Sequence, residues 1–156
     1  MSDKPVLDHL NHLVTVNKDA EAGFHTAAKN VRNSEIETLF EGYASRHAIF
    51  AAEIQSEIER LGEKPSESGT LSGRVNIGWL DLKAVLTGHS VGTMLSACED
   101  GEQTAESAYV DGLEIITSGK AHALLQKQCE EIKGFRTRLA RLVGEMKDGL
   151  DFQKNE

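Results

Sequence analysis

Three side chains occupy positions where a helical core is ordinarily apolar. Following the spacing of three and four residues that places apolar side chains on one helix face puts Glu21, His47 and Glu102 on core-facing positions. A buried carboxylate is costly unless it is paired, protonated or bound to a metal. Carboxylates and imidazole from facing helices are also the ligands of iron and manganese centres in helical bundles. The sequence therefore predicts a polar layer that could hold a metal.

These three residues are also expected at similar heights along the helices. Glu21 lies 12 residues before a break in the helical pattern at Asn33, and His47 lies 14 residues after it. Glu102 lies 16 residues before a second break at Ser118. A helix rises about 1.5 Å per residue, so the three heights differ by only a few ångströms if the two breaks lie at opposite ends. We therefore expect the side chains to converge near the middle of the core.

The fourth helical segment contributes less to this candidate site. Glu131 flanks its apolar seam and is the candidate for a fourth ligand, whereas Phe135 lies 17 residues after Ser118, at the expected height of the site. The Glu-x-x-His pair typical of dinuclear bundle centres occurs nowhere in the chain. Two interpretations remain open. One is an iron or manganese site, and the other is a hydrogen-bonded layer, joined by Asn17 and Gln128, that only fixes helix register.

Four long amphipathic segments must position these residues. They are expected over about 6–31, 34–61, 91–117 and 120–147. The stretch between the second and the third is too long for a tight turn, and it contains a short amphipathic piece over 75–86 around Trp79. Two antiparallel hairpins joined by a long crossover that carries its own short helix are typical of a ferritin-like four-helix bundle. We expect one all-α domain over 1–147 and a polar tail over 148–156.

The bulk composition limits the classes of function. The formal net charge is −8 and the sequence pI is about 5.3, which argues against nonspecific binding of nucleic acid or of anionic lipid. No apolar run approaches the roughly 20 residues of a membrane span. The start of the chain lacks a signal-peptide pattern, and Cys98 and Cys129 are isolated, so we expect a cytoplasmic protein. No catalytic motif is found, and a non-catalytic bundle that binds protein, for example as a homodimer, is the alternative to a metal protein.

Several short motifs together resemble a known family. They are Asp19-Ala20-Glu21-Ala22-Gly23-Phe24, Phe50-Ala51-Ala52-Glu53-Ile54, Leu61-Gly62, Trp79-x-x-Leu82-Lys83-Ala84 and Glu99-x-Gly101-Glu102. As a set, over about Leu7 to Leu142, they are similar to an uncharacterised bacterial ferritin-like family, a four-helix-bundle domain of unknown function. The resemblance implies the fold but no activity. It also implies His-Arg before the crossover Trp and a His in the fourth helix, where this chain has Asn76-Ile77 and Phe135.

Overall fold

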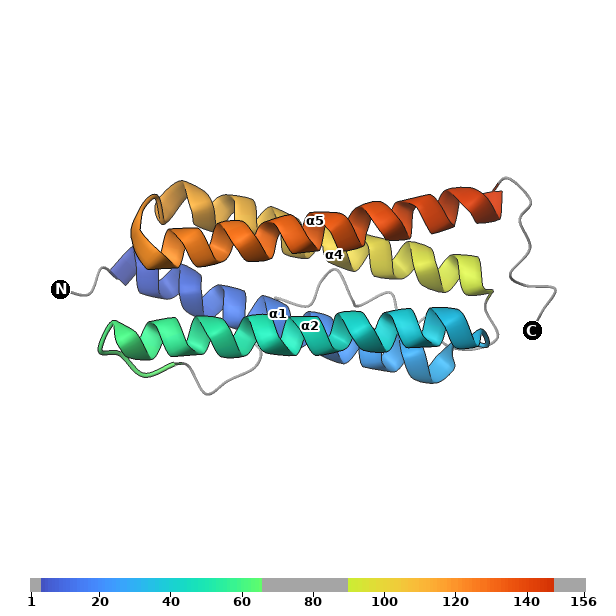
Figure 1. Ribbon diagram of the computed structural model, residues 1–156, viewed down its shortest axis with the longest axis horizontal. Coiled ribbons are helices and arrows are strands. Elements are labelled where there is room, and N and C mark those ends of the chain that lie inside the picture. Colours follow the sequence, from blue (N-terminus) through green and yellow to red (C-terminus); the bar gives the residue numbers. More distant parts are fainter. Residues whose placement is uncertain (1–3, 66–89, 148–156) are drawn as a thin grey trace.

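The computed structural model describes residues 4–65 and 90–147, and these residues form a bundle of four long helices without a strand (Figure 1). The helices are α1 (Lys4–Asn30), α2 (Ser34–Arg60), α4 (Val91–Ile115) and α5 (Gly119–Lys147). The predicted all-α four-helix bundle is confirmed. The short helix expected over 75–86 and the tail expected over 148–156 lie outside the described residues.

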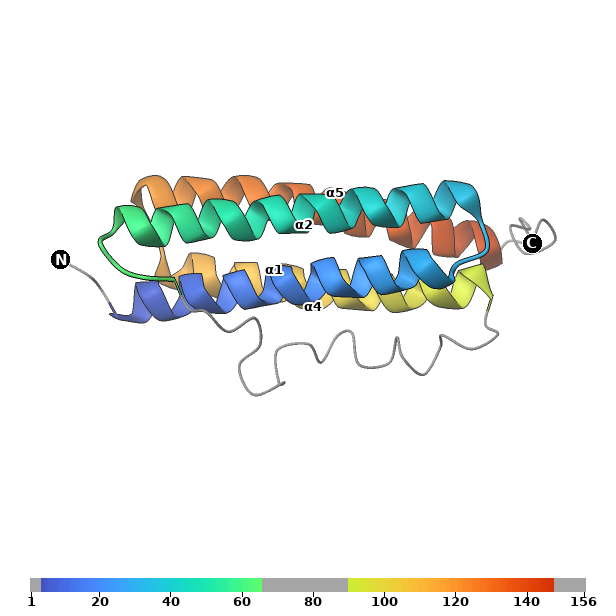
Figure 2. The same ribbon diagram turned by 90° about the horizontal axis from the view of Figure 1, so that it is seen from below.

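The helices form two antiparallel hairpins. The turn between α1 and α2 and the turn between α4 and α5 lie at opposite ends of the bundle (Figures 1 and 2). The start of α4 lies at the end of the bundle opposite to the end of α2, as a long connection between the two hairpins requires. With the two turns at opposite ends, the middles of the four helices lie at about the same height along the bundle axis.

Polar caps and left-handed glycines define the ends of the helices. Asn33 caps α2, with its side-chain oxygen 3.0 Å from the Ile36 amide nitrogen, and Ser90 caps α4 in the same way. Gly62 follows α2 with a φ of +85°, a conformation that side chains with a Cβ rarely adopt. The breaks seen in the sequence are therefore true helix ends.

Two apolar clusters fill the bundle on either side of its middle. One contains Phe24, Phe40 and Leu139, and the other contains Phe50 and Leu125, with other buried aliphatic residues around them. The backbones of α1 and α2 lie close together, whereas those of α2 and α5 approach each other at few points. The seam between α2 and α5 is thus the wider one, and large aromatic and charged side chains bridge it.

Candidate functional site

A layer of five polar side chains lies between the two apolar clusters. Asn17 from α1, His47 from α2, Glu102 and Tyr109 from α4, and Gln128 from α5 are each at most 1% exposed. Burial of so many polar groups is stable only when each has a hydrogen-bond partner. We call these five residues the polar layer.

The hydrogen bonds of Asn17 fix the tautomer of His47. Asn17 Nδ2 lies 2.8 Å from the Leu13 carbonyl oxygen and 2.7 Å from the Tyr109 hydroxyl. A carbonyl can only accept, so the amide nitrogen must point to it, and Asn17 Oδ1 must face His47 Nδ1 at 2.7 Å. Since Oδ1 can only accept, His47 carries a proton on Nδ1.

His47 and Glu102 then form a pair with no net charge. His47 Nε2 lies 2.9 Å and 3.0 Å from the two carboxyl oxygens of Glu102, and neither side chain is exposed. With Nδ1 already protonated, one further proton lies between Nε2 and the carboxyl group. The pair is either imidazolium with carboxylate or imidazole with carboxylic acid. Adding or removing a proton would leave an uncompensated charge in the core.

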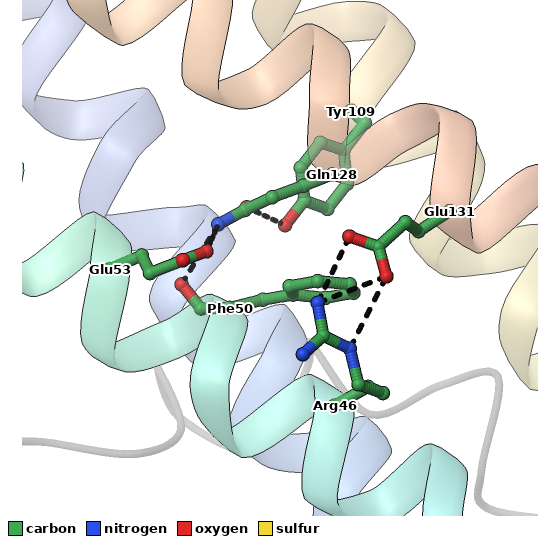
Figure 3. A network of polar contacts seen from close by, with 6 residues as sticks. All are labelled: Arg46, Phe50, Glu53, Tyr109, Gln128 and Glu131. Atoms are coloured by element: carbon green, nitrogen blue, oxygen red, sulfur yellow. Dashed lines mark hydrogen bonds and ion pairs between the residues drawn. The ribbon is translucent and has the colours of Figure 1, made fainter.

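From Asn17, a series of hydrogen bonds runs through Tyr109 and Gln128 to Glu53 at the surface. The Tyr109 hydroxyl donates to Gln128 Oε1 at 2.6 Å, and burial raises the pKa of Tyr109, so this proton stays in place. Gln128 Nε2 lies 3.0 Å from a carboxyl oxygen of Glu53 and 3.3 Å from the Phe50 carbonyl oxygen (Figure 3). Each hydrogen-bond donor of the polar layer therefore meets an acceptor.

Glu21 and Glu131, the other two residues predicted as ligands, lie outside the polar layer. The Glu21 side chain is 36% exposed and lies 3.9 Å from His25, whose other ring nitrogen is 2.6 Å from Glu41. Glu131 is bound through both carboxyl oxygens by the Arg46 guanidinium, with the shortest contacts at 3.0 Å (Figure 3). The structure thus brings together His47 and Glu102 but not the four predicted ligands.

Aromatic rings close the layer on the side of α5. Phe135 stacks on Tyr43 with ring centroids 4.2 Å apart and meets the His47 ring edge-on at 6.0 Å. Phe24 stacks on the His47 ring with centroids 5.9 Å apart. Phe135 thus lies where the fourth helix was expected to face the site, and it contributes an apolar wall.

The layer does not fit a dinuclear iron or manganese centre. Such a centre takes carboxylates from all four helices together with two histidines, whereas this layer offers one imidazole, one carboxyl group, two amides and a phenol. Over residues 4–65 and 90–147, no group of three or more His, Cys, Asp or Glu side chains is arranged to hold a metal. That Glu21, His47, Glu102 and Glu131 bind a metal stays a prediction.

The sequence pointed to four members of the layer, namely Asn17, His47, Glu102 and Gln128. It did not point to the roles of Tyr109 and Arg46. Tyr109 lies on the buried face of its helix, and a buried phenol normally finds a hydrogen-bond partner, which is the signal in the sequence. Arg46 directly precedes the core position His47, so it lies at the edge of the seam, within reach of an acidic residue on α5. Sequence spacing alone does not show that Glu131 is the acidic residue of α5 that pairs with Arg46.

Two expectations about the whole chain are also answered for the described residues. Cys98 and Cys129 are both free and buried. Among the helices of the described ranges, none has an apolar stretch suited to crossing a membrane.

Comparison with known proteins shows a family and a fold. The family described as "Domain of unknown function (DUF2383)" matches residues 5–115. A Dps1 mutant from Mycobacterium smegmatis is similar with a TM-score of 0.77 and 18% identity, covering 92% of this chain and 99% of that one. A bacterioferritin-related dodecameric thioferritin from Bacteroides fragilis gives 0.75 and 16%, covering 96% and 92%. A search of curated protein sequences gives no match.

Proposed function

This chain belongs to the DUF2383 family and has the ferritin-like fold, and we propose that it is a non-catalytic, self-associating bundle whose polar layer fixes helix register. The observation that carries the proposal is the pairing of His47 and Glu102 inside the bundle. The remaining nitrogen of His47 is held by Asn17, an amide, which is a poor ligand for iron. The two residues with metal-binding chemistry are therefore already engaged with groups that stabilise the helix packing.

The polar layer favours one axial alignment of the helices, whereas apolar packing alone would allow several. If one helix slipped by a turn, about 5.4 Å, the apolar residues would still meet apolar residues. The pair of His47 and Glu102 would be separated, and breaking a buried pair costs about 3–5 kcal/mol. Buried polar residues that select one register are well attested in helical bundles.

Self-association is supported by the surface and by the fold. Ile49, Val110 and Ile115 are large apolar side chains that are 42–45% exposed on the single chain. One protein of similar fold is described as dodecameric. Contact between copies would remove such side chains from water. The two free, buried thiols are compatible with the reducing cytoplasm that we propose as its location.

The test compares single and double replacements in the pair. Glu102→Leu leaves a buried imidazole without its partner, and we expect a loss of about 3–5 kcal/mol in the free energy of unfolding. His47→Leu/Glu102→Leu removes both members, so we expect most of that loss to be recovered while alternative packings appear as extra amide signals in NMR spectra. Light scattering should show that the parent protein is larger than one chain. A monomeric parent, or a double variant with one sharp set of signals, would contradict the proposal.

A second candidate function is metal binding, which the likeness to Dps and thioferritin folds favours. In this alternative His47 and Glu102 bind iron or manganese, and Glu21 and Glu131 leave their ion pairs to join them. The measurement is metal content after expression in iron-supplemented medium, with Glu21→Ala/Glu102→Ala as the comparison. Less than about a tenth of an equivalent in the parent protein would exclude a stable site of this ligand type.

A further inference from the structure

α4 and α5 lie side by side (Figure 1), and a groove of about 740 Å³ lies between them at the surface. Its apolar lining comes from Val110 and Leu113 on α4 and from Ala123 and Cys129 on α5. Val110 is 45% exposed, the largest exposed fraction among the large apolar side chains of the described ranges. The second hairpin of a single chain therefore leaves apolar surface in contact with water at this groove.

Val110 stands between two hollows of the same hairpin. It lines the groove, and it also lines a smaller hollow of about 230 Å³ farther from the turn, together with Gln103 and Arg136. An exposed branched side chain beside a hollow is a self-complementary shape, because the side chain of one copy can fill the hollow of another. Such a contact uses the same surface on both partners.

The charged residues of the groove balance one another, although the whole chain has a net charge of −8. They are Glu114 on α4 and Lys127, Glu130 and Lys133 on α5, so that two acidic and two basic groups cancel. The smaller hollow adds only the charge of Asp111, because its other two charged residues form an ion pair. Two copies of an acidic chain repel each other least where the facing surfaces carry little net charge.

One acidic and one basic residue of the groove are left without an ion pair. Glu130 lies 3.5 Å from Lys133, whereas Glu114 and Lys127 form no ion pair within residues 4–65 and 90–147. Glu114 belongs to α4 and Lys127 to α5, so they lie on opposite walls of the groove. A two-fold axis that passes between them places Glu114 of each copy opposite Lys127 of the other, and the ion pair forms twice. A second copy of the chain thus already has the charges that this groove requires of a partner.

We infer that the surface of α4 and α5 around Val110 is an interface with a second copy of this chain, related by a two-fold axis. The inference rests on the self-association proposed above and names the surface that carries it. A helix of 25 residues such as α4 is about 37 Å long, and two adjacent helices are about 20 Å wide. This face has an area of roughly 700 Å² per copy, close to the roughly 800 Å² per partner of a standard interface.

The experiment measures the mass of the chain against its concentration by sedimentation equilibrium. Val110→Glu places a charge at the centre of the interface, and we expect the dissociation constant to rise at least about tenfold. Ile49→Glu is the matched control, because Ile49 on α2 is 42% exposed and the same charge is added there. This variant should keep the dissociation constant of the parent, and circular dichroism checks that both variants keep their helix content.

A charge exchange tests how the two copies are oriented. Glu114→Lys alone places like charges opposite each other, so it should raise the dissociation constant at least about threefold. Lys127→Glu alone should act in the same way. Glu114→Lys/Lys127→Glu reverses both members of the pair and should bring the dissociation constant back to within about twofold of the parent.

Three results would overturn the inference and leave the proposed function intact, all of them with a parent that associates. One is a Val110→Glu variant with the dissociation constant of the parent. Another is an Ile49→Glu variant that is weakened as much as Val110→Glu. The third is a charge exchange that is no stronger than either single reversal. A parent that is monomeric at every concentration would instead contradict both the inference and the proposed function.

Discussion

The interior of the bundle and the seam between α2 and α5 differ in whether their polar groups have partners within the chain. In the interior, five polar groups from four helices meet one another with each donor facing an acceptor. At the seam, the backbones of the two helices come close at few points, and side chains of both helices line a groove at the surface. The polar groups of the interior have their partners within the chain, whereas the groove at the seam is open at the surface. Substitutions of polar groups should therefore cost more stability in the interior than at the seam.

Among the substitutions that compare the interior with the seam, the largest expected effect comes from Asn17, which joins His47 to Tyr109 in the polar layer. Asn17→Leu leaves His47 Nδ1 without an acceptor and removes the donor to the Tyr109 hydroxyl. Each unsatisfied buried group costs about 1–3 kcal/mol, so we expect a loss of about 2–5 kcal/mol in urea unfolding. Asn30→Ala, at an exposed position of the same helix, is the control and should change little. Equal effects of the two substitutions would show that the layer is not a closed network.

Removing a single hydroxyl group compares the two regions directly. Tyr109→Phe leaves Gln128 Oε1 and Asn17 with lost partners, and we expect a loss of about 1–3 kcal/mol in the free energy of unfolding. Tyr43→Phe removes a hydroxyl at the groove that has no hydrogen-bond partner among the described residues, so a change below about 0.5 kcal/mol is expected. The comparison fails if the Tyr43 substitution is as costly as the Tyr109 substitution.

Asp19 provides a pH-dependent test on α1. Burial raises the pKa of Asp19 to about 6, so the folded state holds its proton at a pH where the unfolded state has lost it. The parent chain should therefore lose stability as the pH rises from about 4 to about 6. Asp19→Asn should gain about 1 kcal/mol at pH 7, a figure discounted for partial contact with solvent.

Melting temperatures of the parent and Asp19→Asn chains at pH 7 and at pH 4 check this prediction. The two curves should differ at pH 7 and approach each other at pH 4, because the folded state then holds the proton and the unfolded state, with an ordinary pKa of about 3.9, holds it in a large fraction of the molecules. A difference that persists unchanged at pH 4 would assign the gain to packing rather than to the charge.

The smallest expected effects distinguish an open position from a packed one. Gly42→Ala should stabilise the chain by about 0.5–1 kcal/mol, because alanine favours the helix and the added methyl meets nothing. Gly112→Ala should not give this gain, since its Cβ would lie 3.2 Å from the Leu13 side chain. Thermal unfolding of both variants measures the contrast, and a similar gain at both positions would contradict the tight packing of α1 on α4.

The sequence was sufficient for the fold because helical periodicity is a local property. The positions of Asn17, His47, Glu102 and Gln128 on the apolar seams followed from spacing alone, and the structure confirms that they are buried together. Which of these side chains form hydrogen bonds with one another could not be predicted, because this depends on side-chain directions across four helices.

The position of Glu21 shows where the spacing argument failed. A strict pattern of steps of three and four continued the seam of α1 from Asn17 to Glu21, whereas in the structure it passes through Ala20, which is fully buried. A straight helix has 3.6 residues per turn rather than 3.5, so a seam drifts by about 20° per seven residues. This shift moved Glu21 to the half-exposed face and left Asn17 as the partner of His47.

The most direct test of the closed polar layer is the ¹⁵N NMR spectrum of His47. The account predicts that Nδ1 carries a proton that exchanges slowly with solvent and correlates across its hydrogen bond to Asn17. The Asn17→Leu variant should lose this protection. A His47 that is protonated only on Nε2, or whose Nδ1 proton exchanges as fast as that of the half-exposed His25, would contradict the closed, net-neutral layer.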